Sequence, residues 1–173
     1  MIRELIILTL ITFIPGLELR ASIPYGMLGN ERFGITPGLL GWPWVALVCI
    51  VANIVLGWAV FSAMGPVLRW AEHFRWFAKH VQPRLERMQG RLKPYVDKYG
   101  EFGVAVFIGV PLPGSGVYTG AVGAFLLGLN PRKFAIANVL GVIIAGAIVT
   151  AIALLIQEGR ELPWLDWVIK RQG

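Results

Sequence analysis

The composition of this 173-residue sequence is that of a membrane-embedded chain: 56% of the residues are hydrophobic, 15% are charged, and the mean hydropathy is +0.66. A soluble domain has roughly a quarter of its residues charged, so this chain carries too little charge to cover a water-exposed surface. Its net charge of +6 is concentrated in one stretch beside apolar segments, which the positive-inside rule explains without any binding of nucleic acid.

Two segments of the chain are predicted to cross the bilayer as helices. The apolar sequence is divided into blocks at 5–28, 39–65 and 102–157. Within them, residues 44–64 and 133–156 are long enough to span and contain no proline. The sequence therefore predicts an all-α integral membrane protein.

Two other apolar segments are interrupted and are not expected to be simple spans. Block 5–28 is broken around Pro15 and Pro24, and residues 102–127 are broken by the proline- and glycine-rich stretch 109–116. Irregular backbone at membrane depth is tolerated only where it is buried in protein or lines a cavity. Each segment is therefore predicted to be a re-entrant helical hairpin, although a full span is the alternative for the N-terminal block.

The two halves of the sequence resemble each other. Each contains a Phe-Ile pair followed at the same spacing by a glycine, Gly26 or Gly120, and each predicted crossing contains an Ala-Asn pair, at Asn53 or Asn138. A unit of one hairpin and one crossing, when repeated, comes out with opposite orientation. Inverted repeats of this kind recur in transporters and bind substrate at their interrupted segments. A chance resemblance between apolar segments is the alternative.

A basic stretch connects the two predicted repeats. Between Arg69 and Lys98 there are eight Lys and Arg residues against three Asp and Glu, which places the loop 69–99 in the cytoplasm. Its apolar residues recur at helical spacing, so we expect amphipathic helices that lie on the membrane surface or pack on the protein itself. The chain is thus expected to form a single membrane domain of four parts: first repeat 1–65, connecting helices 66–100, second repeat 101–157 and polar tail 158–173.

Glu18 and Arg20 are the sharpest functional signal in the sequence. Ionisable groups inside a membrane segment are costly and face the protein interior or a water-filled cavity. We expect the pair to lie in irregular backbone between Pro15 and Pro24 and to meet the opposite hairpin. Glu18 then either carries protons or stays ionised and holds Arg20 ready for an anion. A purely structural pairing is the alternative.

The second predicted hairpin contributes backbone groups and three polar side chains. Glycine-rich backbone permits close approach to a ligand, and the N-terminus of a broken helix attracts anions. Gly120, Gly123 and Gly141 are expected to serve helix packing, with Asn53 and Asn138 donating hydrogen bonds to open carbonyls of the hairpins. The predicted substrate or proton site comprises Pro15, Glu18, Arg20, Pro24, Pro111, Pro113, Gly114, Ser115, Gly116, Tyr118 and Thr119, supported by Asn53, Asn138 and Gly120.

Signatures of enzymes are missing from the sequence. It contains no nucleotide-binding loop, no metal-ligand spacing, and no Ser/His/Asp or Cys/His set that could meet. We therefore expect neither catalysis, nor a cofactor, nor a metal.

Two motifs carry a family resemblance. A Pro-x-x-Glu-Leu-Arg-x-x-Ile-Pro element runs from Pro15 to Pro24, and a Pro-Leu-Pro-Gly-Ser-Gly-x-Tyr-Thr-Gly element runs from Pro111 to Gly120. Together they resemble the small multi-drug export protein family, which is similar to the wider DedA (VTT-domain) superfamily. The resemblance implies two facing re-entrant hairpins, and export of small molecules or translocation of lipid carriers such as polyprenyl phosphates. This chain lacks the arginine that DedA-type members tend to carry in the second hairpin.

The expected function is therefore transport across a membrane, by proton-coupled export or by lipid-phosphate translocation. The expected partners are membrane lipids, a small-molecule or lipid-phosphate substrate and protons, and a homodimer is left open. The expected location is the plasma membrane of a prokaryote. A scaffold that docks partners through the basic connecting helices is the alternative from a different class.

Overall fold

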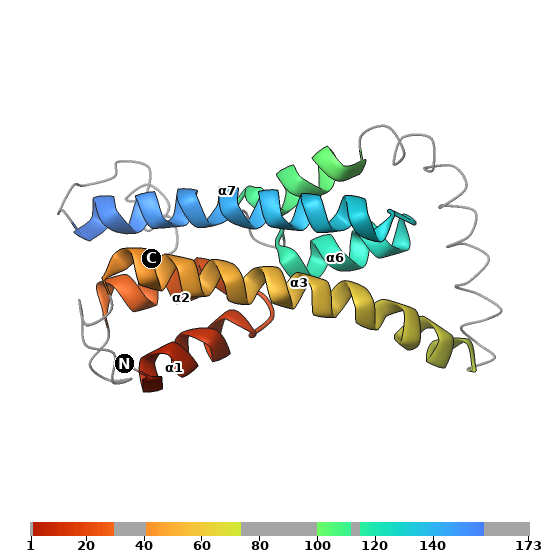
Figure 1. Ribbon diagram of the computed structural model, residues 1–173, viewed down its shortest axis with the longest axis horizontal. Coiled ribbons are helices and arrows are strands. Elements are labelled where there is room, and N and C mark those ends of the chain that lie inside the picture. Colours follow the sequence, from red (N-terminus) through yellow and green to blue (C-terminus); the bar gives the residue numbers. More distant parts are fainter. Residues whose placement is uncertain (1, 30–40, 74–99, 112–114, 158–173) are drawn as a thin grey trace, which may run out of the picture.

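The computed structural model describes residues 2–29, 41–73, 100–111 and 115–157, and every regular element in these ranges is a helix (Figure 1). The helices are α1 (Ile2–Thr12), α2 (Glu18–Leu28), α3 (Trp42–Glu72), a helix at Gly100–Gly109, α6 (Val117–Leu126) and α7 (Pro131–Gln157).

The two long helices form the frame of the molecule. α3 has 31 residues and α7 has 27, and each is apolar and long enough to cross a membrane. At 1.5 Å per residue they reach about 45 Å and 40 Å, more than the roughly 30 Å of a hydrocarbon core. They pack side by side and run in opposite directions (Figure 1). Both predicted crossings are therefore confirmed as helices of spanning length.

The C-terminal end of α3 differs from the sequence prediction. The helix continues through Pro66 to Glu72, so residues 66–72 extend the long helix and do not begin a separate connecting helix. The rest of the predicted connecting segment, 74–99, and the polar tail lie outside the described residues.

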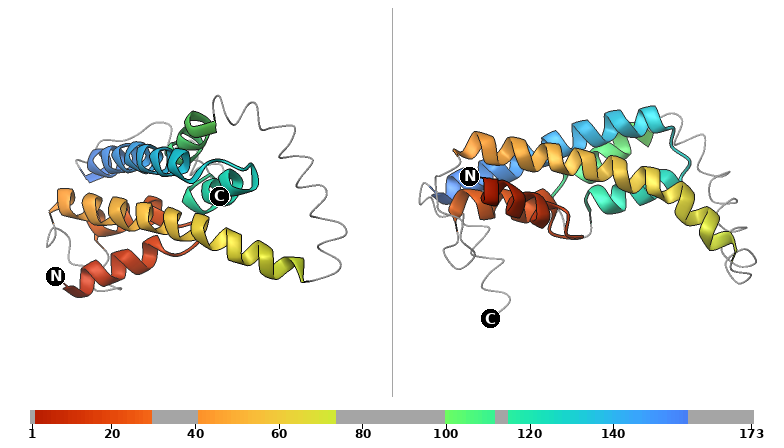
Figure 2. Two further views of the ribbon diagram at one scale, coloured as in Figure 1. Left: turned by 45° about the vertical axis from the view of Figure 1, so that its right-hand side comes forward. Right: turned by 60° about the horizontal axis from the view of Figure 1, so that its bottom comes forward.

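The short helices form two hairpins, α1 with α2 and Gly100–Gly109 with α6. α1 and α2 have 11 residues each and α6 has 10, so each reaches only about 15 Å, half of what a crossing requires. The hairpins enter from opposite ends of the molecule, and their tips meet near its middle (Figures 1 and 2). α2 of the first hairpin packs on α7, and α6 of the second packs on α3.

Local sequence explains where the first hairpin turns. α1 ends at Thr12, and the turn that follows contains Pro15, which cannot donate a backbone hydrogen bond, and Gly16 at φ +86°. Pro24, by contrast, lies inside α2. The prediction of irregular backbone up to Pro24 was therefore wrong for Arg20 and Pro24, which lie inside α2, whereas Glu18 begins the helix with an irregular φ of +48°.

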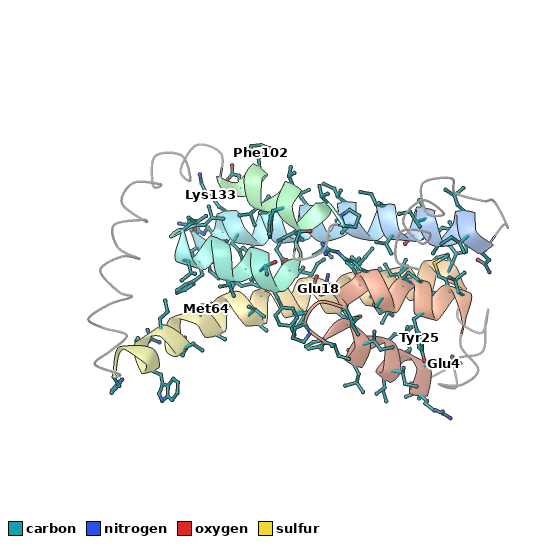
Figure 3. The ribbon with its side chains drawn as sticks, turned by 180° about the vertical axis from the view of Figure 1, so that it is seen from behind. Glu4, Glu18, Tyr25, Met64, Phe102 and Lys133 are labelled. Carbon is teal, nitrogen blue, oxygen red and sulfur yellow. The ribbon has the colours of Figure 1, made fainter. Side chains whose placement is uncertain are left out.

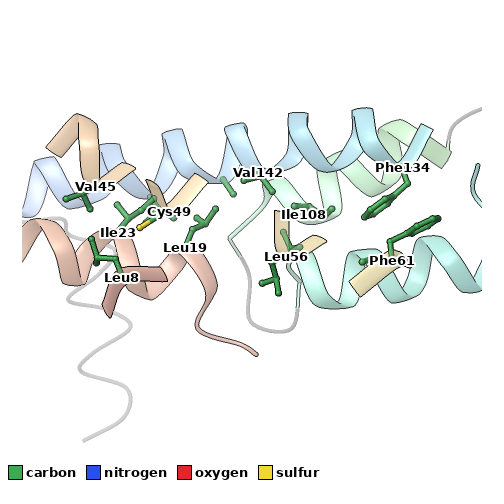
Figure 4. Close-up of a cluster of buried hydrophobic side chains, with 14 of the residues drawn as sticks. Leu8, Leu19, Ile23, Val45, Cys49, Leu56, Phe61, Ile108, Phe134 and Val142 are labelled. Carbon is green, nitrogen blue, oxygen red and sulfur yellow. The ribbon is translucent and has the colours of Figure 1, made fainter. Parts of the chain in front are cut away.

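Buried apolar side chains form one core along the length of the molecule (Figure 4). Leu8, Ile23 and Val45 join α1, α2 and α3 at one end. At the other end, Phe61 of α3 and Phe134 of α7 stack with ring centroids 4.2 Å apart. Many large apolar side chains on the outer faces of α3 and α7 are exposed, a distribution that suits lipid and not water.

Glycine permits the second hairpin to lie against α7. A Cβ added at Gly141 would lie 2.7 Å from Ile108 Cβ and 2.8 Å from the carbonyl oxygen of Ala105. A Cβ added at Gly120 of α6 would likewise lie 2.6 Å from Cγ1 of Ile108. A Cβ at Gly123 would meet no described atom within 4 Å, so the packing role predicted for that glycine finds no neighbour in this part of the chain.

The contrast between two of these glycines gives a stability prediction. Gly141→Ala should destabilise the protein by about 1–3 kcal/mol, because the new methyl group overlaps the carbonyl oxygen of Ala105 and the Cβ of Ile108, neither of which can rotate away. Gly123→Ala should leave stability unchanged or slightly raise it, since alanine is the better helix former and the space is open. Thermal unfolding in detergent measures both variants, and equal melting temperatures would contradict the packing described for Gly141.

Candidate functional site

The tips of the two hairpins meet in a polar junction that includes several of the predicted site residues. Glu18 and Arg20 come from the first turn of α2, and Ser115, Gly116 and Tyr118 come from the tip of the second hairpin and the start of α6. Figure 3 shows Glu18 in the middle of the molecule, where the hairpins approach each other. We call this set of five residues the hairpin junction.

The Glu18 carboxylate caps the N-terminus of α6. Its Oε2 accepts a hydrogen bond from the backbone N–H of Val117 at 3.0 Å, and its Oε1 accepts one from Tyr118 N–H at 3.2 Å. The Glu18 residue is only 4% exposed. The first N–H groups of a helix have no partner within the helix, and its dipole favours negative charge there. Glu18 of the first hairpin thus satisfies two open N–H donors of the second hairpin.

Gly116 makes this contact possible. The residue adopts φ +151°, and a Cβ added there would lie 2.7 Å from Glu18 Oε2 and 2.8 Å from Oε1. Any larger side chain would therefore push the carboxylate away from α6. The site role predicted for Gly116 corresponds here to a close approach of backbone and carboxylate.

Arg20 binds at the C-terminal end of a helix, whereas Glu18 binds at an N-terminal end. Its guanidinium donates hydrogen bonds to the carbonyl oxygen of Ser115, to Ser115 Oγ at 3.0 Å and to the carbonyl oxygen of Val110 at 3.2 Å. Val110 directly follows the helix Gly100–Gly109, whose last carbonyls have no partner within the helix. A cation at a helix C-terminus is favourable for the same electrostatic reason as an anion at the N-terminus.

Tyr118 makes the opposite contact, in which a side chain of the second hairpin binds the main chain of the first. Its phenolic oxygen donates a hydrogen bond to the carbonyl oxygen of Phe13, just beyond the end of α1. Thr119, the neighbouring predicted residue, donates to the carbonyl oxygen of Gly116 in its own hairpin at 3.3 Å. Each hairpin therefore supplies a side chain that satisfies a main-chain carbonyl at the tip of the other.

The backbone of Glu18 is itself unusual. Its φ is +48°, the only positive φ of a non-glycine residue in the described ranges. The left-handed region costs an L-residue about 1–2 kcal/mol, and strain of this kind persists where surrounding contacts hold it in place. The two hydrogen bonds to α6 are such contacts.

The other predicted residues are placed as follows. Pro15 lies in the turn of the first hairpin, Pro111 directly follows Val110, and Pro113 and Gly114 lie outside the described residues. Asn138 donates through Nδ2 to the carbonyl oxygen of Ile54 on α3 at 2.9 Å, so its acceptor lies on the other long helix and not on a hairpin.

Sequence reasoning missed a second buried carboxylate. Glu4 is 5% exposed in the first turn of α1, at the end of the first hairpin away from the junction and near Tyr25 (Figure 3). In the sequence, Glu4 follows Arg3 and precedes the apolar block 5–28, a position typical of an exposed polar residue at the end of a membrane segment. A second missed feature is the bond of 2.7 Å between Thr12 Oγ1 and Ser22 Oγ, which ties α1 to α2. No group of His, Cys, Asp or Glu among the described residues could hold a metal ion.

Two glycines with positive φ allow the contact with Glu18 to be tested. Gly116→Ala should destabilise the folded protein and weaken function more than Gly128→Ala. Both substitutions strain a left-handed backbone, but a Cβ at Gly128 (φ +74°) meets nothing within 4 Å, whereas one at Gly116 meets the carboxylate. Melting temperatures of the two variants in detergent provide the comparison. Equal losses would mean that the carboxylate contact contributes nothing.

Comparison with known proteins assigns the family. Residues 18–148 match the model of a family described as "Putative small multi-drug export protein". The match includes Glu18, Arg20 and the whole second hairpin, and it covers well over half of the chain. No curated protein and no solved structure matches the chain. The wider relationship to the DedA superfamily is not part of this match and stays a prediction. The chain belongs to the family of small multi-drug export proteins, membrane proteins named for a role in transport.

Proposed function

We propose that this membrane protein is a proton-coupled exporter in which the hairpin junction is both the gate and the substrate site. The observation that carries the proposal is the contact of Glu18 with the N-terminus of α6. A buried charge here holds one hairpin to the other, so a change of that charge acts directly on the contact between them.

The proposal includes two re-entrant hairpins related by an inverted repeat. Three observations support it: the hairpin helices are about half as long as a crossing, the hairpins enter from opposite ends, and the packing of α2 on α7 has its counterpart in the packing of α6 on α3. Discontinuous helices that meet at the midplane are a recurrent site of binding in transporters.

Protonation of Glu18 would loosen the junction. The ionised carboxylate accepts two main-chain N–H bonds, one at each oxygen. A protonated carboxyl has a hydroxyl donor at one oxygen, which cannot serve the N–H of Val117 or Tyr118 as well, and it no longer carries the charge that the helix end favours. Proton uptake thereby favours separation of the two hairpin tips.

The separated tips would offer a site for an anionic group. Once Glu18 no longer holds them, the first N–H groups of α6 are open donors, and Arg20 binds Ser115 at the same hairpin tip; both kinds of donor suit phosphate or carboxylate. A cation would meet the positive end of α6 instead. We therefore propose a lipophilic substrate with an anionic group, of which a lipid-phosphate carrier such as polyprenyl phosphate is the type.

An apolar groove beside the junction suits the rest of such a molecule. It has a volume of about 400 Å³ and runs between α1 and α2, where Leu17 lies next to Glu18. Its lining consists of Ile7, Ile11, Leu17, Ala21 and Tyr25.

The proposed topology predicts which side of the membrane two positions face. Cysteines introduced at Arg84 and at Arg132, in a chain whose Cys49 has been replaced, should both react with a membrane-impermeant reagent from the cytoplasmic side. A re-entrant second hairpin returns the chain to the side it left, and the positive-inside rule makes that side cytoplasmic. Labelling from opposite sides would show that the segment 102–127 spans the membrane.

The proposed mechanism predicts a dependence on the pH gradient. In liposomes, the parent protein should move a fluorescent prenyl phosphate in response to an imposed gradient, and Glu18→Gln should abolish that response while the protein stays folded. Glu101→Gln is the matched control. Glu101 is partly exposed and forms an ion pair with Lys133, with 3.6 Å between Oε2 and Nζ, so its charge should contribute little to transport.

Ethidium, a lipophilic cation, serves as the opposing probe in the same liposomes. Transport of ethidium but not of the anion would contradict the proposed substrate class. Transport of neither by folded protein would favour the scaffold alternative.

A further inference from the structure

Asn53 of α3 has a buried side-chain oxygen that accepts no hydrogen bond from the described residues. The residue is 1% exposed. A buried acceptor without a donor is costly, so the groups around Asn53 matter. Asn138 Oδ1 of α7 is in the same condition, but the Asn138 amide lies against Gly57, one turn farther along α3 toward the second hairpin.

α2 and α3 pack in antiparallel register. A Cβ added at Gly26 of α2 would lie 2.6 Å from Cγ1 of Val45, in the first turn of α3. One turn later on α3, the thiol of Cys49 lies beside the hydroxyl of Ser22, one turn earlier on α2. Figure 4 shows Val45 and Cys49 in this order along α3. Each turn of α3 toward the middle is thus matched by one turn of α2 toward the tip of the first hairpin.

Contacts with both hairpins place Asn53 at the level of the junction. One more turn of the same register pairs Glu18 of α2 with Asn53 of α3. On the other side, the rings of Phe125 in α6 and Phe61 in α3 have centroids 5.4 Å apart. α6 and α3 run in the same direction (Figure 1), and about 12 Å, or eight residues, before these rings are Val117 and Asn53. Asn53 therefore lies where Glu18 caps the start of α6.

A protonated Glu18 carboxyl needs an acceptor for its hydroxyl, because the residue is buried. The main-chain N–H groups at the start of α6 are donors and cannot serve. The carbonyl oxygens of Ser115 and Phe13, at the two hairpin tips, already accept side-chain donors. Asn53 Oδ1 is an open acceptor at the same level of the molecule.

We propose that Asn53 Oδ1 accepts a hydrogen bond from the hydroxyl of protonated Glu18. The proton stays on the carboxyl, so a neutral acid meets a neutral amide and no charge is buried. Asn53 is thus a positioning residue, which stabilises the Glu18 side chain in the state that no longer binds α6. The inference rests on the proton-dependent gate of the proposed function and names the group that receives Glu18 when the gate is released.

The other titratable groups near Glu18 do not fill this role. Arg20 of α2 carries only donors, the Tyr118 hydroxyl of α6 binds the main chain of the first hairpin, and the Cys49 sulfur of α3 is a weak acceptor. The remaining charged residues of the helices that pack here lie toward the outer ends of those helices: Arg3, Glu4, Glu101, Arg132 and Lys133.

Infrared spectroscopy of the protein in liposomes tests the contact. The C=O band of protonated Glu18, identified by its loss in Glu18→Gln, should lie at the frequency of a hydrogen-bonded carboxyl. Asn53→Leu, similar in size, should move the band to higher frequency, because the hydroxyl loses its acceptor. An unmoved band in the folded variant, or a parent band at the frequency of a free carboxyl, would overturn the proposal.

Two further variants keep this measurement decisive. Asn138→Leu removes the other open amide oxygen and should leave the band in place, so a shift in this variant but not in Asn53→Leu would also overturn the proposal. Asn53→Val, with a smaller apolar side chain, replaces Asn53→Leu if that variant does not fold. The parent band needs no substitution at Asn53 and remains informative in either case.

Transport measures whether the contact matters to the gate. Asn53→Leu should weaken the response of prenyl phosphate transport to a pH gradient about three- to tenfold, the size expected for one hydrogen bond. Thr150→Val is the matched control and should keep the response. Thr150 is a buried residue of α7 whose hydroxyl has no partner among the described residues, and it lies about three turns beyond Asn138. An undiminished response in Asn53→Leu would overturn the role of Asn53 in the gate.

The two measurements separate this inference from the proposed function. A band that moves in Asn53→Leu, in a parent protein that transports nothing, would contradict the exporter alone. Transport driven by a pH gradient, with a band that does not move, would contradict the role of Asn53 alone. The absence of any Glu18 band in folded protein at acidic pH would contradict the protonation on which both depend.

Discussion

The structure depends on one electrostatic contact, the capping of α6 by the Glu18 carboxylate. A helix that begins inside a bilayer has several N–H groups that neither lipid nor its own turns can satisfy. Glu18 meets two of them, and its own buried charge is met by the positive end of the helix. Neither group is stable alone when buried, so the contact requires the two hairpin tips to meet.

The same reasoning extends to the rest of the junction. Arg20 satisfies carbonyls of Val110 and Ser115 at the tip of the second hairpin, and Tyr118 satisfies the carbonyl of Phe13 at the tip of the first. Each hairpin thus has main-chain groups that side chains of the other hairpin satisfy. In the function we propose, a proton or an anionic substrate competes for these same contacts, so that the junction serves as a gate.

The sequence predicted features that depend on local chemistry. Apolar runs of spanning length without proline indicated α3 and α7, proline and glycine indicated where the hairpins turn, and the cost of a buried charge drew attention to Glu18 and Arg20. What it could not show was the partner of each charge, because that depends on residues about a hundred positions away. Pro24 was assigned to irregular backbone since its tolerance inside α2 follows from tertiary packing. Glu4 escaped notice because only the fold shows that it is buried.

Reversible cross-linking of the two tips tests the central claim most directly. Phe13 and Val110 contribute only main-chain oxygens to the junction, so both can be replaced by cysteine without loss of those bonds, in a chain whose Cys49 has been replaced. A bifunctional thiol reagent with a cleavable disulfide spacer should join the two positions in membranes and stop transport, and reduction should restore it. Tips that each react but do not cross-link, or cross-linked protein that still transports, would contradict the account.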